Sequence, residues 1–222
     1  MTATPPSEAA PAPRRVVGAL VPDPRRPGSV RVLVDGRPLL TVAADAADAE
    51  RLAPGVVLDE ARFERLSRAA DDEAALRTAL RLLGRRPYAE RDLVRRLQQK
   101  GHPAAAALAA AGKAARLGLI DDERFARHYV ETRAARGRGP LRLRRDLAAL
   151  GVARGVVDRT LEEVLGPEGV EAPDAEAIAR KRLAQLKGLA APVRRRRLVA
   201  FLARRGYAGD RVRQMVTRLL QP

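Results

Sequence analysis

One frame of residues recurs three times in this chain of 222 residues, and it constrains the fold more than any other feature. The frame is leucine, three residues, leucine, three residues, glycine, and it occupies residues 93–101, 143–151 and 198–206. Residues four apart lie on one face of an α-helix, and a glycine just past the last turn readily takes the left-handed conformation that ends a helix. Each copy therefore predicts a short amphipathic helix with a sharp stop.

The three frames predict a repeat architecture. Another apolar pattern of helical spacing follows each frame and another precedes it, so that we expect nine helices in three triples. The final glycines are 50 and 55 residues apart, a spacing typical of tandem helical repeats. The fold class is therefore mainly α, with three helix-turn-helix-like repeats of three helices each. Their expected bounds are residues 70–119, 120–166 and 173–221, and the first helix is expected to begin near residue 72.

A small α+β module is expected ahead of the repeats, over residues 15–66. β-prone runs occupy residues 16–21, 30–34 and 39–42, and Asp35-Gly36 between two of them is a strong hairpin signal. A short helix over residues 43–52 and a fourth strand over residues 56–58 complete this prediction. Residues 1–14, rich in proline and alanine, are interpreted as a disordered tail.

Positive charge is concentrated in the repeats. The formal net charge is +16, of which residues 1–70 contribute +1 and residues 71–222 contribute +15. A polyanion or an acidic protein surface is the natural partner of such a chain. A GC-rich genome would explain why 39 of the 43 basic residues are arginine, but it would not explain the nearly neutral first third.

Composition excludes several classes of function. The chain has no cysteine, which rules out disulfides, thiolate metal sites and a cysteine nucleophile, and its two histidines leave little for zinc binding or imidazole catalysis. No paired carboxylates assemble outside helix starts. We therefore expect no enzyme, no metal and no cofactor. No apolar run approaches the roughly 20 residues that span a bilayer, and no signal peptide is recognisable, so we expect a cytoplasmic protein.

The middle helix of each repeat supplies the candidate contact residues. Positions nine, six and two before the final glycine share a face predicted to lie away from the leucines, and five of these nine positions are arginine. A merely solvated helix face is the competing interpretation. The candidates for contacts with DNA or a protein partner are Arg95, Arg96, Lys100, Arg142, Arg144, Arg145, Arg194, Arg195, Arg196, Arg197, Arg204 and Arg205. Further candidates lie in the loops, namely Arg85, Arg86, Arg136 and Arg138.

The ring-bearing side chains are expected to pack rather than to react. His102 follows the first frame glycine, where the other frames have Val152 and Tyr207, which favours a packing role. Tyr88, Phe125 and Tyr129 could stack on bases, but their spacing favours the core.

The second repeat carries a family resemblance. Residues 121–130 (DDERFARHYV), Gly137-x-Gly139-Pro140 and the frame that ends at Gly151-Val152 together resemble the central signature of the RecX family of recombinase regulators. The resemblance covers roughly residues 72–220. One departure is Ala89, at a position where the family tends to carry an N-capping serine. The cap of that helix must therefore come from elsewhere, or the helix loses about 1 kcal/mol.

The resemblance implies a curved array of three-helix repeats that binds the RecA recombinase and the groove of its nucleoprotein filament. It also implies inhibition of strand exchange, ATP hydrolysis and associated activities in DNA repair, recombination and the SOS response. Single- and double-stranded DNA are then partners, a membrane is not, and we expect a monomer. The alternative is a helix-turn-helix transcriptional regulator, which would place one helix in the major groove and usually act as a dimer.

Overall fold

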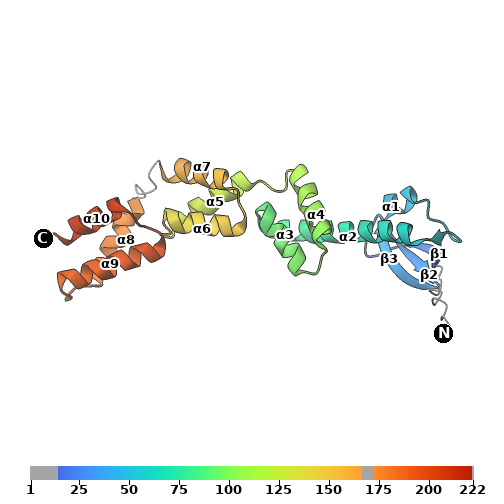
Figure 1. Cartoon of the computed structure of the whole chain (residues 1–222), viewed down its shortest axis with the longest axis horizontal. Helices are drawn as coiled ribbons and strands as arrows, with labels where there is room; N and C mark the ends of the chain where they lie inside the picture. Colours follow the sequence, from blue (N-terminus) through green and yellow to red (C-terminus); the bar gives the residue numbers. More distant parts are fainter. Residues whose placement is uncertain (1–14, 167–172, 222) are drawn as a thin grey trace, which may run out of the picture. The chain divides into compact units, whose positions relative to one another are not determined.

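The computed structural model describes residues 15–166 and 173–221, without the side chains of residues 173 and 174 (Figure 1). The expected tail over residues 1–14 lies outside the described residues, as does most of the linker before the third repeat. Within the described residues there are four strands, β1 (Arg15–Pro22), β2 (Ser29–Val34), β3 (Arg37–Ala43) and β4 (Val57–Leu58). The described helices are α1 (Ala44–Ala49), α2 (Glu60–Leu83), α3 (Glu90–Gln99), α4 (Ala104–Arg116), α5 (Asp122–Ala134), α6 (Pro140–Leu150), α7 (Arg154–Leu165), α8 (Pro173–Ala184), α9 (Ala191–Arg205) and α10 (Asp210–Leu220).

Helices α2 to α10 form the nine expected helices in three successive triples, so the predicted fold class is confirmed over the described chain. By their internal contacts the described residues form two compact units. One contains the sheet with α1, and the other contains α3 and every helix from α5 onward.

The N-terminal sheet is antiparallel with strand order β3-β2-β1-β4. Asp35 and Gly36 both have positive φ, of 51° and 71°, as the predicted hairpin turn between β2 and β3 requires. The short strand β4 pairs with the start of β1, which confirms the expected fourth strand. The core of this module packs one face of the sheet against α1 and the first half of α2 (Figure 1), through Val17, Val32, Val42, Ala47 and Leu66.

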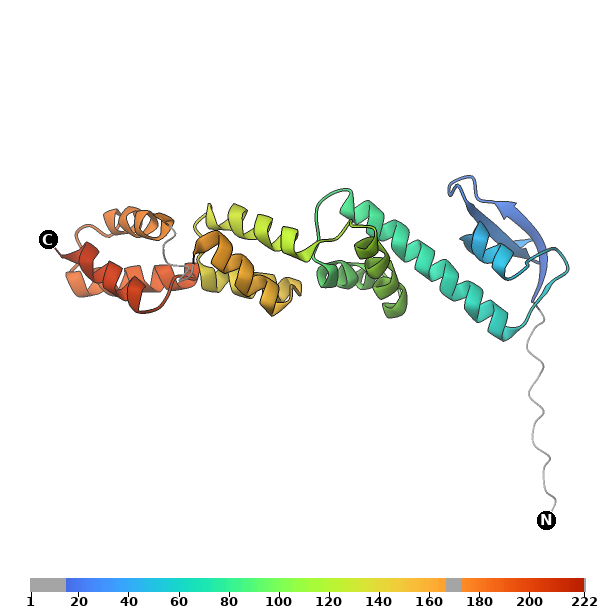
Figure 2. The ribbon, with the colours of Figure 1, turned by 90° about the horizontal axis from the view of Figure 1, so that it is seen from above.

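Helix α2 begins twelve residues earlier than the sequence pattern predicted. It runs without a break from Glu60 to Leu83 (Figure 2), so the expected start near residue 72 is wrong. The start is explained by Asp59, whose Oδ1 accepts a hydrogen bond from the backbone N–H of Arg62 at 2.7 Å, the contact of a helix N-cap. The expected gap between the module and the first repeat lies inside this one helix.

The three frames fold as predicted. Their frame glycines, Gly101, Gly151 and Gly206, have φ values of 90°, 88° and 92°, which is the left-handed conformation. The six frame leucines are fully buried, namely Leu93, Leu97, Leu143, Leu147, Leu198 and Leu202.

The residues that follow the frame glycines pack as expected. Val152 and Tyr207 are buried, and the half-buried ring of His102 lies 3.0 Å from the hydroxyl of Thr78. Tyr88 and Phe125 are buried as well. These side chains therefore have structural roles.

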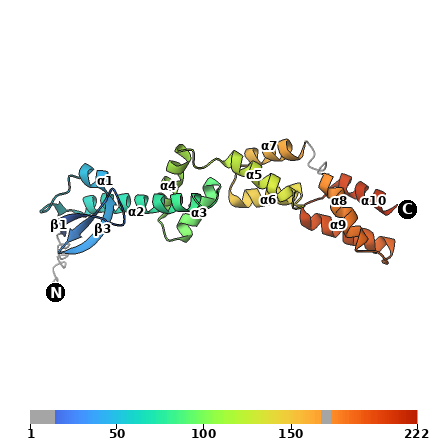
Figure 3. The same ribbon diagram turned by 180° about the vertical axis from the view of Figure 1, so that it is seen from behind.

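The second and third repeats, α5 to α7 and α8 to α10 in Figure 3, have separate cores. Phe125, Val130 and Leu161 pack with the frame leucines of α6 in the second repeat. Ala179 and Met215 pack with those of α9 in the third. Each repeat thus buries its own apolar stripes, as its amphipathic spacing dictates.

Backbone hydrogen bonds join the second repeat to the third. The N–H of Gly139 donates to the carbonyl oxygen of Arg205 at 2.7 Å, and the N–H of Leu141 donates to that of Gly206 at 3.1 Å. A Cβ at residue 139 would lie 2.6 Å from the carbonyl carbon of Gly206, so only glycine permits this approach. Gly139 therefore serves a close contact between backbones, and Pro140 begins α6 as expected.

Candidate functional site

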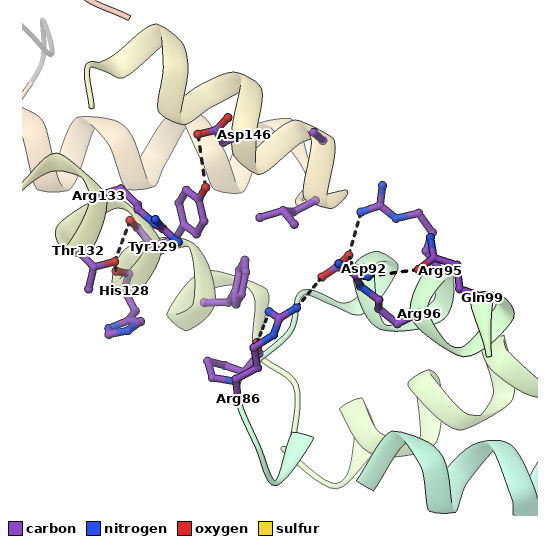
Figure 4. Close-up of a pocket in the computed structure, with 14 residues that line it drawn as sticks. Arg86, Asp92, Arg95, Arg96, Gln99, His128, Tyr129, Thr132, Arg133 and Asp146 are labelled. Atoms are coloured by element: carbon purple, nitrogen blue, oxygen red, sulfur yellow. Dashed lines mark hydrogen bonds and ion pairs between the residues drawn. The ribbon is translucent and has the colours of Figure 1, made fainter. Parts of the chain in front are cut away.

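A groove lies between α3 of the first repeat and α5 and α6 of the second (Figure 4). Its volume is about 740 Å³. We call it the polar groove, because charged and hydrogen-bonding side chains dominate its walls. Those side chains are Arg86, Asp92, Arg95, Arg96, Gln99, His128, Tyr129, Thr132, Arg133 and Asp146.

Asp92 organises the arginines on one side of the polar groove. Its side chain is only 5% exposed, and three guanidinium groups surround it. Oδ1 lies 3.1 Å from Nη2 of Arg95 and 4.0 Å from Nε of Arg96, and Oδ2 lies 3.7 Å from Nη2 of Arg86. The contact with Arg86 is too long for a hydrogen bond, and Oδ2 has no hydrogen-bond partner. One buried carboxylate thus orients three half-exposed cations that have unused N–H donors.

Asp146 likewise orients arginines on the other side of the groove. Its Oδ2 lies 2.6 Å from Nη1 of Arg138, and its Oδ1 lies 3.1 Å from Nε of Arg142. The hydroxyl of Tyr129 also donates to Oδ2, at 3.4 Å. Burial, and then the negative charge of Asp146, raise the pKa of Tyr129, so the phenol stays protonated and can donate at neutral pH. The guanidinium of Arg133 lies 5.4 Å from the centroid of the Tyr129 ring.

The polar groove and its rim carry an excess of positive charge. Six arginines surround two aspartates, so the formal balance is strongly cationic. Each guanidinium has five N–H donors in a planar fork, which matches the oxygens of phosphate and carboxylate groups. The groove is therefore suited to bind anionic groups, with its arginines held in place beforehand.

Two contacts between neighbouring repeats hold the walls of the groove. The backbone N–H of Glu90, at the start of α3, donates to Oδ1 of Asp122 in α5 at 2.9 Å. This bond supplies the cap that Ala89 cannot provide. The glycine that ends α6, Gly151, lies against the side chain of Arg91 in α3, where a Cβ would collide. The second repeat therefore caps the start of α3, and the end of α6 packs closely against the first repeat.

The arginines of the third repeat lie in a different setting. Arg195 and Arg196 line an apolar groove between α9 and α10, and no ion pair holds either of them within the described residues. Arg194 is half-buried. Nη1 of Arg205 points to the carbonyl oxygens of Arg136, at 3.5 Å, and Gly137, at 3.3 Å. Arg205 thus belongs to the junction between repeats.

The remaining candidates are spread over the surface. Nη1 of Arg144 lies 2.9 Å from Oδ1 of Asp158 in α7, so this pair joins two helices of one repeat. Four others are exposed and form no ion pair with any residue that the structure describes, namely Lys100, Arg145, Arg197 and Arg204. The twelve candidates therefore do not form one surface. Arg95 and Arg96 line the polar groove, Arg142 pairs with Asp146 of that groove, and Arg195 and Arg196 line the apolar groove of the third repeat.

Sequence reasoning missed part of the polar groove. Asp92 was expected on an exposed face, but it is buried, because Arg86 folds back over it from the preceding loop. Arg133 and Asp146 were not identified as groove residues. The helical spacing of four between Tyr129 and Arg133 was a usable signal for one of them, because such residues share a face.

The described residues contain neither a metal-binding cluster nor a membrane-spanning helix. No group of three or more His, Asp or Glu side chains there is close enough together to hold a metal ion. None of the described helices combines the length and the apolar character needed to cross a membrane.

The fold and the site define a class: basic proteins built from tandem three-helix repeats. Family models for the first, second and third three-helix domains of RecX match residues 75–112, 121–161 and 174–216. The chain belongs to the RecX family of regulatory proteins.

Individual relatives agree with this assignment. The chain is 37% identical over 147 residues to the regulatory protein RecX of Halorhodospira halophila, which covers 65% of the chain and 87% of the relative. It is 38% identical over 139 residues to the regulatory protein RecX of Chromohalobacter salexigens, and this alignment covers 61% of the chain and 86% of the relative. A crystal structure of regulatory protein RecX matches 92% of the chain and 99% of its own length, with a TM-score of 0.72 at 23% identity. The crystal structure of RecX from Lactobacillus salivarius matches 68% of the chain and 96% of its own length, with a TM-score of 0.58 at 16% identity. These two structures show the same fold.

Proposed function

We propose that this chain binds the RecA recombinase and its nucleoprotein filament, and that it thereby inhibits strand exchange and ATP hydrolysis during DNA repair and recombination. The observation that carries the proposal is the presence of all three RecX domains in one chain. The protein acts by binding rather than by catalysis, as a monomer in the cytoplasm.

The polar groove supplies the contact with DNA in this proposal. Arg95 and Arg96 lie on its walls beside Asp92, and Arg142 pairs with Asp146, which lines the groove. Phosphates of the DNA in the filament would meet their free N–H donors, while exposed arginines of the third repeat meet acidic protein surface. Contacts with phosphates release counterions, so binding to DNA should weaken steeply as salt rises.

The decisive experiment measures ATP hydrolysis by RecA assembled on single-stranded DNA while this protein is titrated in. We expect strong inhibition by the wild type and weaker inhibition by Arg142→Ala/Arg145→Ala. The matched control is Arg127→Ala/Arg159→Ala, which removes two arginines from the same repeat that pair with Glu163 and Glu123 away from the groove. Circular dichroism confirms that both variants are folded.

Absence of inhibition by the wild type at any concentration would refute the proposal. A transcriptional regulator would then be the better hypothesis. It predicts tight binding to one particular duplex sequence, which a selection from random duplexes would reveal.

A further inference from the structure

The third repeat has a second, chemically different groove. It lies between α9 and α10, has a volume of about 840 Å³, and has a mainly apolar floor that includes Pro192, Val199 and Leu220. Two arginines of α9, Arg195 and Arg196, flank this floor. We call it the apolar groove.

The apolar groove follows the axes of two helices. On α9 its lining residues are 191, 192, 195, 196, 199 and 200, which is the spacing of one helical stripe. On α10 the lining residues 213, 217 and 220 form a second stripe. The frame leucines of α9 lie beside this stripe and are buried in the core of the repeat. At 1.5 Å per residue the groove extends for about 14 Å along α9, enough for about two turns of a ligand helix.

The arginines of this groove have no partner within the chain as described. Helix α9 contains six arginines and no acidic residue, and no acidic side chain lies in its first turn. Neither Arg195 nor Arg196 forms an ion pair or side-chain hydrogen bond with another described residue, and both are exposed. Arg213, on the α10 side, is already paired with Asp210, with Nε 3.2 Å from Oδ1. The unsatisfied positive charge therefore flanks an apolar floor.

This combination selects one kind of occupant. A nucleic-acid backbone would leave the apolar floor without a role, because phosphates need donors along their whole path. A helix with apolar side chains on one face and carboxylates along its flank fills the floor and neutralises the arginines together. We propose that the apolar groove is a docking site for an acidic, amphipathic helical segment of a protein partner.

The apolar groove adds to the proposed function a contact with protein that is separate from the contact with DNA. DNA is assigned to the polar groove, and the protein partner is assigned to the apolar groove. Only the identity of the partner as RecA rests on the proposed function. The chemistry of the segment rests on the groove itself.

The test uses the full-length chain and a fluorescent helical peptide of about 18 residues, with leucines at positions i, i+3, i+4 and i+7 and glutamates beside them. Fluorescence anisotropy should show saturable binding to the wild type. Arg195→Glu/Arg196→Glu should weaken that binding at least about tenfold, because two favourable contacts become repulsive. The matched control, Lys181→Glu/Lys187→Glu, makes the same change of charge in the same repeat outside the groove and should change the affinity less than about twofold.

Two further measurements test the apolar floor and the occupant. Leu220→Ser should also weaken peptide binding, and a peptide whose leucines are replaced by serine should not bind. The inference is overturned if the two peptides bind equally well, if the two charge variants behave alike, or if a single-stranded oligonucleotide displaces the peptide as effectively as excess unlabelled peptide. Circular dichroism and urea unfolding establish that each variant is folded.

A displacement experiment with RecA in the absence of DNA tests whether RecA is the partner. Displacement of the bound peptide by RecA supports docking in this groove. If the protein inhibits ATP hydrolysis by RecA on single-stranded DNA but RecA does not displace the peptide, the assignment of the groove to that partner is overturned. If the peptide binds with the discrimination described above but the wild type neither binds nor inhibits RecA, the docking site stands and the proposed function fails.

Discussion

The polar groove and the apolar groove are built on the same sequence frame, yet they present arginine in opposite ways. In the polar groove, Asp92 and Asp146 fix the guanidinium groups by ion pairs. In the apolar groove, Arg195 and Arg196 extend beside an apolar floor with no such carboxylate. Cations that are oriented in advance favour a regular array of anions such as a phosphate backbone. Unpaired cations beside apolar surface favour a partner that brings both carboxylates and apolar side chains. Net charge alone does not distinguish these two surfaces.

The largest expected effect concerns the joint between the repeats that carry the two grooves. In Gly206→Ala the new Cβ would collide with the backbone nitrogen of Arg142. We expect a loss of about 2–5 kcal/mol in unfolding free energy, from left-handed strain together with overpacking. Urea unfolding monitored by circular dichroism measures this loss.

The equivalent glycines provide the control series. Nothing lies within 4 Å of a Cβ at Gly101, so Gly101→Ala should cost only the conformational strain, about 1–2 kcal/mol. Gly151→Ala meets the side chain of Arg91, which can move, and should be intermediate. Equal losses at all three positions would show that the joint between the second and third repeats adds nothing to stability.

The second prediction tests whether the two grooves differ in their contact with DNA. Arg95→Ala/Arg96→Ala should lower the affinity for single-stranded DNA, and the slope of log affinity against log salt should fall by roughly 1.4 for two lost phosphate contacts. Arg195→Ala/Arg196→Ala should leave that slope nearly unchanged. Anisotropy titrations over a range of salt concentrations measure both slopes. Equal reductions would abolish the distinction between the grooves.

The third prediction concerns the wall of the polar groove. Asp122→Ala removes the acceptor for the backbone N–H of Glu90, so α3 should lose its cap at a cost of about 1 kcal/mol. Asp121→Ala is the comparison, because it removes the N-cap of α5 itself, whose Oδ1 accepts from the N–H of Arg124 at 2.9 Å. Hydrogen exchange should then show fraying at the start of α3 in the first variant only. Fraying of α3 in both variants would contradict this assignment of the caps.

The repeats could be predicted from the sequence because their causes are local. A leucine spacing of four and a left-handed glycine are properties of one helix and its end, and all three frames follow them. The start of α2 was placed too late because the leucine pattern begins later than the helix, which starts just after its cap, Asp59.

The polar groove could be predicted only in part, because its geometry comes from contacts of α3 with a loop and with the next repeat. Spacing along α3 identified Arg95 and Arg96, but nothing in that helix shows that Arg86 folds over Asp92 and buries it. The cap from Asp122 to Glu90 likewise joins residues 32 positions apart. The first contact depends on the path of the loop before α3 and the second on how one repeat packs against the next, and the frame itself encodes neither.

The smallest expected effect tests whether ion pairs matter outside the polar groove. Arg144 and Asp158 pair at 2.9 Å, with exposed fractions of 50% and 40% for their side chains. Solvent screens so exposed a pair, and Asp158 keeps Arg154 as a neighbour at 3.5 Å. Arg144→Ala should therefore change the unfolding free energy by less than about 0.5 kcal/mol and lower DNA affinity less than the Arg95/Arg96 variant does. Urea unfolding and the same anisotropy titration measure both quantities. A loss of DNA affinity as large as that of the groove variant would mean that phosphate contacts extend over the whole second repeat, and that the ordered arginines of the polar groove have no special part in binding DNA.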